Sequence, residues 1–349
     1  MIIGVLLKKD KIRDWHHIFM LIAQSRGHIV FCFKANDVDF DNKKILGSTL
    51  SNGKIIEKIF DFPDVVRNVP TRRNPHDRKI VGELVKIIPF TCGGIKSKSE
   101  VNLELLGIPE LKKYALPVAR FQSFEDIKSQ LLQHQKIILK PRKGNHGKGI
   151  YSIKMNNDDF GVVHSKSLKI FNNEELMNFT DDILKDDNKI YDIYPFFDSC
   201  TNTGLTTAFR LTLMRGENGR WNRMELLPNV NIIPNQNIVN AFEGSLLSKH
   251  YDIFLDQFYP NMKNKINEDI NFLVKNFYKF QKLYKRPFDE VGLDLGIDQQ
   301  ANVVIFEINV APGTGLYLYE SCKNSVDFCE YLYKNNSYKT LEISPLTHH

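Results

Sequence analysis

The chain has few cysteines, and their spacing matches neither a disulfide framework nor a zinc site. Five cysteines are scattered along the sequence and include no CxxC pair: Cys32, Cys92, Cys200, Cys322 and Cys329. A disulfide-rich secreted domain or a structural zinc site needs cysteines that are grouped or regularly spaced. We therefore expect reduced thiols, most of them in the core.

The chain also lacks a long apolar run and a strong charge of one sign. No stretch approaches the roughly 18 to 20 apolar residues of a membrane-spanning helix, and the first residues do not have the pattern of a signal peptide. Lys and Arg total 47 against 41 Asp and Glu, and the net charge of +6 is spread along the sequence. We expect a cytoplasmic protein that binds neither membrane nor nucleic acid, with a basic cleft for an anionic substrate.

The first ninety residues predict a small α/β domain. Short apolar runs alternate with helical spacing, and Gly27 is placed to cap a helix before the next strand. Strands are expected at 2–7, 28–33, 55–60, 65–68 and 86–90, and helices at 15–24 and 78–85. The opening strand, helix and strand form a βαβ unit, which predicts a parallel sheet. Two glycines in the break at 91–94 indicate the first domain boundary.

The remaining residues predict α+β architecture with mostly antiparallel sheets. Ser123 with Asp126, and Asn172 with Glu175, have the spacing of capping boxes at helix starts. The other expected elements are a helix from about Ser99, strands at 115–121, 136–141, 150–155, 161–164, 189–195, 207–215, 221–227, 291–297 and 302–309, and an amphipathic helix that carries Ile270, Leu273, Val274, Phe277 and Tyr284. A length of 349 residues favours two or three compact units, which we place at 1–92, 93–190 and 191–345.

A glycine-rich loop follows a strand that carries Lys140 near its end. Gly144, Asn145, Gly147 and Gly149 lie within six positions of one another. Such a loop can adopt positive φ angles and present backbone N–H groups to an anion. The spacing and the lack of a following helix exclude a P-loop and a Rossmann site. The loop is a candidate phosphate clamp, and the alternative is a flexible basic turn.

Two acidic residues lie in apolar strands near the end of the chain. Asp294 is in VGLDLGI, and Glu307 and Asn309 are in VVIFEINVAPG. Side chains two apart on a strand share a face, so Glu307 and Asn309 point the same way. Buried acids are costly without a cation, and carboxylate and amide oxygens suit one or two Mg²⁺ ions that also hold phosphates. The alternative is a structural network in which these acids pair with arginines.

The loop and the acidic strands together resemble the ATP-grasp superfamily. Its members carry a strand lysine before a glycine loop and, later, an Asp followed by Glu-x-Asn and Pro-Gly. Here these positions are Lys140, Asp294, Glu307, Asn309, Pro312 and Gly313. The chain looks most similar to the spore-coat-associated YheC/YheD group and, more distantly, to the glutamate and D-alanine ligases. The resemblance runs from about Lys98 to Gly313. It implies an ATP-grasp fold, with two α+β subdomains clasping ATP behind a small α/β domain.

The resemblance implies roles for several basic and loop residues. Lys98 looks like the lysine that opens the ATP-grasp region and reaches the ATP phosphates, and Lys96 competes for that role. Arg210 looks like the arginine that the family aims at the transferred phosphate and the acyl oxygen, so Arg210 and Lys140 are the expected catalytic residues. Asn240 and Gly244 resemble an N-x-x-x-G loop beside the active site.

The resemblance also implies where ATP and Mg²⁺ bind. The phosphates are expected at the glycine loop, the adenine at the hinge, and the metal at Asp294, Glu307 and Asn309. Pro195 has no N–H, so its carbonyl would accept from the adenine amino group, and Phe197 would donate. The expected ATP-binding residues are Lys98, Lys140, Gly144, Asn145, Gly147, Lys148, Gly149, Tyr194, Pro195 and Phe197.

Two departures limit what the resemblance says about the substrate. Ala208 stands where the family's DxR motif has an acid, and Gly292 stands where D-alanine ligases hold an arginine for the substrate carboxylate. A D-alanine dipeptide product is therefore not expected.

The resulting prediction is an ATP-dependent carboxylate–amine ligase that forms an amide or peptide bond through an acyl phosphate. Its partners would be small-molecule or peptide carboxylates and amines. An ATP-grasp kinase or phosphotransferase and a nucleotide-binding coat-type structural protein are the alternatives, although the intact acidic residues count against the structural role. The sequence contains no signal for the oligomeric state.

Overall fold

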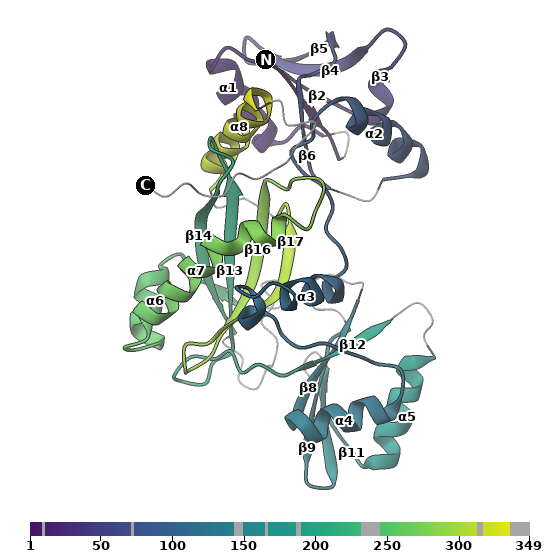
Figure 1. Cartoon of the computed structure of the whole chain (residues 1–349), viewed down its shortest axis with the longest axis vertical. Helices are drawn as coiled ribbons and strands as arrows, with labels where there is room; N and C mark the ends of the chain where they lie inside the picture. Colours follow the sequence, from purple (N-terminus) through teal and green to yellow (C-terminus); the bar gives the residue numbers. More distant parts are fainter. Residues whose placement is uncertain are drawn as a thin grey trace.

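The computed structural model describes residues 1–8, 11–70, 73–142, 149–164, 167–185, 190–231, 245–312 and 317–335. Three sheets follow one another along the long axis of the molecule, and each is covered by helices (Figure 1). All five cysteines are free thiols, and four of them are buried. The mixed sheets and helices confirm the predicted α+β class and the predicted reduced cysteines.

The first sheet is mixed rather than parallel, which corrects the sequence prediction. Its strands are β1 (Ile2–Leu6), β2 (Ile29–Phe33), β3 (Val38–Asp39), β4 (Lys44–Ser51), β5 (Lys54–Asp61) and β6 (Val65–Asn68). Strands β6, β1 and β2 are parallel, as the βαβ pattern predicts, but β4 pairs antiparallel with β2, β3 and β5. Asn52 and Gly53 close the β4–β5 hairpin with φ angles of 48° and 73°. The Asn-Gly dipeptide in the sequence was a signal for this turn.

Three helices pack against the first sheet, and one of them comes from the other end of the chain. These are α1 (Asp14–Ser25), α2 (Pro75–Ile87) and α8 (Leu318–Lys334), with a short 3-10 turn η1 (Ala35–Asp37). The predicted strand at 86–90 is wrong. Helix α2 runs to Ile87, and Ile88 becomes extended because Pro89 follows it; only Phe90 makes a bridge, to Val66.

The second sheet forms the lower lobe of the molecule in Figure 1. Its order is β11-β10-β9-β8-β12-β7, and its helices α4 and α5 begin at the predicted capping boxes. Of the predicted strand at 115–121, only Ala119–Arg120 is a strand, because Pro117 cannot donate to a ladder. The bounds are β7 (Ala119–Arg120), α4 (Phe124–His134), β8 (Lys136–Pro141), β9 (Tyr151–Asn156), β10 (Asp159–His164), β11 (Ser167–Phe171), α5 (Asn173–Leu184) and β12 (Tyr191–Pro195).

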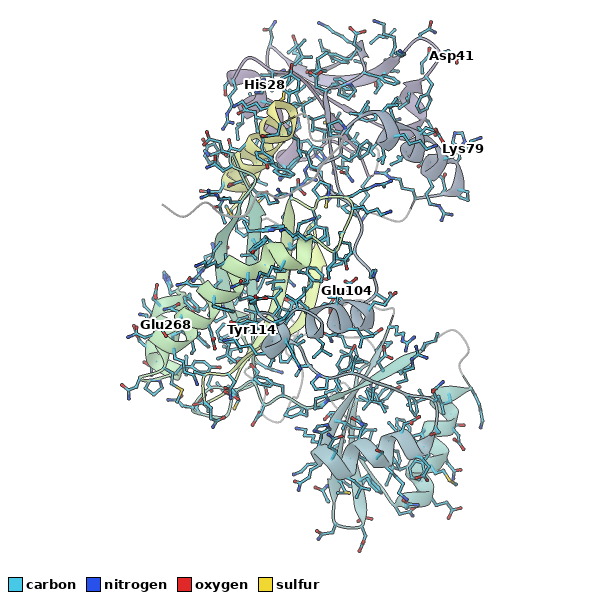
Figure 2. The ribbon with its side chains drawn as sticks, in the orientation of Figure 1. His28, Asp41, Lys79, Glu104, Tyr114 and Glu268 are labelled. Atoms are coloured by element: carbon cyan, nitrogen blue, oxygen red, sulfur yellow. The ribbon has the colours of Figure 1, made fainter. Side chains whose placement is uncertain are left out.

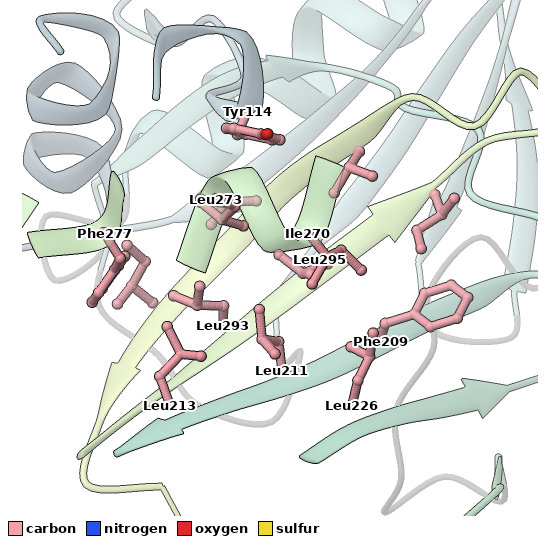
Figure 3. Close-up of a cluster of buried hydrophobic side chains, with 14 of the residues drawn as sticks. Tyr114, Phe209, Leu211, Leu213, Leu226, Ile270, Leu273, Phe277, Leu293 and Leu295 are labelled. Atoms are coloured by element: carbon pink, nitrogen blue, oxygen red, sulfur yellow. The ribbon is translucent and has the colours of Figure 1, made fainter. Parts of the chain in front are cut away.

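The third sheet lies between the other two and is antiparallel, in the order β15-β14-β13-β16-β17. Helix α7 places a fully buried stripe on one of its faces, including Ile270, Leu273 and Phe277, as Figure 3 shows. The bounds are α3 (Lys98–Leu106), η2 (Lys112–Tyr114), β13 (Thr207–Arg215), β14 (Trp221–Val230), β15 (Leu246–Leu247), α6 (Tyr251–Phe258), α7 (Lys263–Gln281), β16 (Glu290–Ile297) and β17 (Val303–Val310). The opposite face of this sheet is left for polar side chains.

The division at residues 92 and 190 remains a prediction, and the packing crosses it in three places. Strand β12 pairs with β8 of the second sheet, and α3 packs in the core of the third sheet. Helix α8 returns to the first sheet, where Cys322, Val326 and Cys329 join its core. Their helical spacing was visible in the sequence, but only the fold shows which sheet they cover.

Candidate active site

Charged side chains form a row across three strands of the third sheet. The strand register places Arg210 on β13 opposite Asp294 on β16, and Asp294 opposite Glu307 on β17. Arg210 donates from Nε to Asp294 Oδ1 at 2.5 Å and from Nη2 to Asp294 Oδ2 at 3.0 Å. Asn309 donates from Nδ2 to Asp294 Oδ2 at 3.1 Å. The residues predicted from two separate sequence motifs therefore converge on one face.

Two lysines from other parts of the fold reach the same row. Lys98 is the first residue of α3, and its Nζ lies 3.1 Å from Glu307 Oε2. Lys140, near the end of β8, has its Nζ 3.5 Å from the same oxygen and donates to the carbonyl of Phe306 at 3.1 Å. The ion pair of Lys140 with Glu307 therefore links the second sheet to the third.

The two candidate lysines near the start of α3 have different partners. Lys96 Nζ lies 2.6 Å from Glu104 Oε1, and Tyr284 donates to the other oxygen of Glu104 at 2.5 Å. Figure 2 labels Glu104 on α3. Lys98 belongs to the charged row, whereas Lys96 pairs with Glu104 instead.

Burial raises the pKa of both acids and neighbouring cations lower it, but the net shift differs between the two acids. Burial raises the pKa of Asp294, and Arg210 only partly offsets this. Burial also acts to raise the pKa of Glu307, but Lys140 and Lys98 outweigh it, so that pKa is lowered. Burial lowers the pKa of Lys140, and Glu307 opposes the change. Glu307 is therefore ionised at neutral pH.

The oxygen donors of the row have the chemistry of a magnesium site. Two carboxylates and one amide, on Asp294, Glu307 and Asn309, lie on adjacent strands, and Mg²⁺ prefers a few such oxygens together with phosphate and water. No group of three or more His, Cys, Asp or Glu residues suited to a metal occurs in the parts of the chain that the structure describes. The set fits an ion that shares its coordination with a bound phosphate.

A bulge next to Glu307 creates an aromatic surface that the sequence analysis missed. Leu295 pairs with Ile305 and Asp294 pairs with Glu307, so Phe306 is an extra residue in β17. Bulges re-aim side chains and are common beside active sites. The ring centroid of Phe306 lies 6.1 Å from that of Phe197, and a Cβ on Gly296 would come within 2.3 Å of Phe306. The signal available in the sequence was Gly296, two strand positions from Asp294, because a glycine there leaves room for an aromatic side chain.

The predicted hinge residues lie next to this aromatic surface. Pro195 is the last residue of β12, and Phe197 lies two residues further on. Tyr194 is buried, and burial raises the pKa of its hydroxyl. Asp192, on the same strand, accepts two bonds from Arg142 Nε and one from its Nη2. This contact between β12 and the residue after β8 holds the hinge strand beside the lysine strand.

Several predicted residues lie outside the part of the chain that the structure describes. They are Gly144, Asn145, Gly147, Lys148, Asn240, Gly244 and Gly313. Gly149, at the end of the glycine loop, is described. It has a φ of 77°, and a Cβ there would lie 3.2 Å from the Tyr191 hydroxyl. This one loop position therefore requires glycine.

Several solved structures share the fold of this chain. N5-carboxyaminoimidazole synthetase from Staphylococcus aureus complexed with ADP is similar at a TM-score of 0.53 and 14% identity, covering 94% of this chain and 76% of that one. D-cycloserine synthetase DcsG is similar at 0.52 and 9%, covering 97% and 100%. Macrocyclase MdnC bound with precursor peptide MdnA, from Microcystis aeruginosa MRC, is similar at 0.50 and 12%, covering 95% and 99%. No curated protein matches the chain in sequence.

The fold is that of an ATP-grasp protein, which confirms the predicted fold. The chain belongs to the YheC/D-like ATP-grasp family, which matches residues 87–332. Proteins of the ATP-grasp family bind ATP. Among the described helices, none has the length and apolar character needed to cross a membrane.

Proposed function

We propose that the protein is an ATP-dependent carboxylate–amine ligase that forms an amide or peptide bond and releases ADP and phosphate. One observation carries the proposal: Lys98, Lys140 and Arg210 reach the oxygen donors of Asp294 and Glu307 from three separate elements. This arrangement of cations and oxygens matches what a transferring phosphoryl group requires. Family membership supports ATP as the phosphoryl donor.

In this proposal the nucleotide binds between the second and third sheets. Lys98 and Lys140 would exchange Glu307 for the phosphates, with the loop residues Gly144, Asn145, Gly147, Lys148 and Gly149 closing over them. The adenine would lie against Phe306 and Phe197, near Tyr194, with the Pro195 carbonyl and the Phe197 N–H as its partners. Mg²⁺ held by Asp294, Glu307 and Asn309 would neutralise phosphate charge.

The residues on this face would position and stabilise rather than react covalently. A substrate carboxylate oxygen attacks the γ-phosphorus, ADP leaves, and an acyl phosphate forms. An amine then forms a C–N bond while the C–O bond to phosphate breaks. Arg210 would stabilise charge on the transferring phosphate and then on the acyl oxygen. Exclusion of water by the closed loop would protect the acyl phosphate from hydrolysis.

The test is to detect an acyl phosphate. A panel of carboxylates is screened with Mg-ATP for ADP release, and hydroxylamine is added to trap the acyl group as a hydroxamate. With an oxygen-18-labelled carboxylate, one label should move into the released phosphate. AMP as the product, or a phosphate ester without label transfer, would overturn the ligase assignment in favour of an adenylating enzyme or a kinase. A protein that neither binds nor turns over Mg-ATP would have a structural role.

A further inference from the structure

The two carboxylates of the charged row are bonded to cations of the protein itself. Arg210 donates to both oxygens of Asp294 from separate guanidinium nitrogens, at 2.5 and 3.0 Å. Glu307 Oε2 has two ammonium groups near it, Lys98 Nζ at 3.1 Å and Lys140 Nζ at 3.5 Å. The acids that would hold a metal ion are therefore paired with the cations that would hold phosphate.

The pair of Arg210 with Asp294 occupies most of the room for a metal ion at this carboxylate. Asn309 donates from Nδ2 to the same Oδ2 atom that receives Arg210 Nη2. A carboxylate oxygen has two lone pairs, so Oδ2 is filled. A metal ion bound through the remaining lone pair of Oδ1 would lie beside the guanidinium charge. Bidentate pairs of arginine with a carboxylate are also among the stronger ones.

The charge balance of the row points the same way. Among the described residues, three cations from three separate elements, Lys98, Lys140 and Arg210, face two carboxylates. The row thus carries one positive charge more than it has negative ones. Such a surface repels a free divalent cation and attracts a polyanion such as the phosphate chain of a nucleotide.

These ion pairs are accessible enough to exchange partners. Lys98 and Glu307 are 24% and 22% exposed, and both members of the Arg210–Asp294 pair are half-buried. The acids lie on β16 and β17, whereas the cations lie on α3, β8 and β13. Long cationic side chains can turn from an acid to a phosphate while the strands that carry the acids stay in place.

We propose that Arg210, Lys98 and Lys140 close the metal site until phosphate groups draw them away, so that nucleotide binds before the metal ion or together with it. The inference rests on the proposed function, which assigns phosphates to these cations and Mg²⁺ to the acids. Arg210 contributes most to the closure, because it bonds to both oxygens of its partner. One consequence is that Arg210 turns toward the transferring phosphate in the same step that completes the metal site.

Electron paramagnetic resonance of Mn²⁺ tests this order, because the signal of free Mn²⁺ is lost on binding. Mn²⁺ takes the same oxygen ligands as Mg²⁺. Mn²⁺ should bind the wild-type protein at least about tenfold more tightly with ADP present than without it, a coupling of ordinary size. A titration of ADP alone corrects for Mn²⁺ bound in solution. Calorimetry in EDTA should show that ADP binds without any metal ion.

Arg210→Gln distinguishes a closed metal site from one that merely lacks phosphate oxygens. The change releases both oxygens of Asp294 and removes one positive charge, so free Mn²⁺ should bind this variant at least about tenfold more tightly than the wild type. A site that lacked only phosphate oxygens would gain nothing. Lys96→Met is the matched control, because it removes the same charge from a lysine that pairs with Glu104 outside the row. It should bind Mn²⁺ as the wild type does.

Lys98→Met, at the start of α3, keeps the test decisive if circular dichroism shows that Arg210→Gln does not fold. It should give a smaller gain in affinity for free Mn²⁺, because Glu307 keeps its contact with Lys140. The same variant is expected to bind nucleotide more weakly, so its effects on the two ligands have opposite signs. A general disturbance of the site would weaken both.

The outcomes separate the binding order from the proposed function. The order is wrong if the wild type binds free Mn²⁺ as tightly as its ADP complex does, or binds ADP only when metal is present. The closure by cations is wrong if the folded Arg210→Gln protein, or Lys98→Met in its place, gains no affinity for free Mn²⁺. If the wild type binds ADP neither with nor without Mn²⁺, the proposed function itself fails.

Discussion

Two groups of charges along β16 differ in how completely they are paired. In the row of the candidate active site, Arg210 and Asp294 make two hydrogen bonds, and their side chains are 35% and 28% exposed. At the junction with the first sheet, Arg67 Nη2 lies 3.4 Å from Glu290 Oε2, and these side chains are only 5% and 2% exposed. Within the described part of the chain, Arg67 Nε and Glu290 Oε1 have no hydrogen-bond partner.

The comparison shows two uses of buried charge. Solvent reaches the active-site row, so its ion pairs can exchange partners with a ligand at modest cost. The Arg67–Glu290 pair is dry and incompletely bonded, and desolvation of such a pair can exceed the attraction between its charges. The first group should therefore control turnover, and the second should control stability.

The largest expected effect is on turnover and comes from Glu307→Gln. This change removes one charged oxygen donor and the partner of both Lys98 and Lys140, so we expect turnover to fall on the order of 10²-fold or more. Asn309→Ala should act in the same direction. Glu104→Gln is the matched control, because Glu104 pairs with Lys96 away from the row. Circular dichroism establishes that each variant folds, and near-normal turnover in Glu307→Gln would show that the row does not hold the phosphates.

The next effect is on stability and depends on pH. Burial raises the pKa of Glu290 to about 8, above its ordinary value of 4.5. A raised pKa in the folded state contributes stability that is present below pH 4.5 and is lost as pH rises toward 8. Glu290→Gln cannot ionise, so at pH 9 it should be more stable than the wild type by a few kcal/mol, on the order set by such a shift.

Denaturant unfolding of the wild type and Glu290→Gln at pH 5 and pH 9 checks this prediction. The difference between the two proteins removes the contributions of titrating groups that are common to both. If the free energies of unfolding of the two proteins differ by the same amount at pH 5 and at pH 9, Glu290 does not titrate in this range.

A smaller effect distinguishes two neighbouring lysines. Lys98→Met should weaken Mg-ATP binding roughly tenfold, because it removes one charge-assisted contact to phosphate, whereas Lys96→Met should not. Calorimetric titration of both variants with a non-hydrolysable ATP analogue and Mg²⁺ measures this. If both variants bind the ATP analogue equally more weakly, the net positive charge of the protein, and not the position of Lys98, decides the affinity for Mg-ATP.

The smallest effect concerns the packing around Arg210. A Cβ at Gly292 would come within 2.9 Å of Pro312 Cβ and 3.1 Å of Arg210 Cδ. Gly292→Ala should cost about 1 kcal/mol and lower turnover several-fold by displacing Arg210. Gly82→Ala, in α2 with no atom within 4 Å of the added Cβ, should instead stabilise by about 0.5–1 kcal/mol. Thermal unfolding together with turnover of both variants makes the comparison, and an unchanged Gly292→Ala protein would contradict it.

Local chemistry along the chain was enough to predict many elements and to single out the acids of the candidate site. The capping boxes at Ser123 and Asn172 start helices because their bonds span only three residues. Asp294 and Glu307 were identifiable because acids in apolar strands require a partner. The Asn52-Gly53 turn and the apolar spacing on α8 are equally local signals.

The packing between sheets decided the rest. Lys98 rather than Lys96 reaches Glu307, Phe306 turns toward Phe197 through a bulge, and α8 returns to the first sheet. Lys140 and Glu307 are 167 positions apart along the chain, yet their charged atoms lie 3.5 Å apart. No periodicity within a strand or helix encodes such a distance, because it depends on how two separately formed sheets are held against each other.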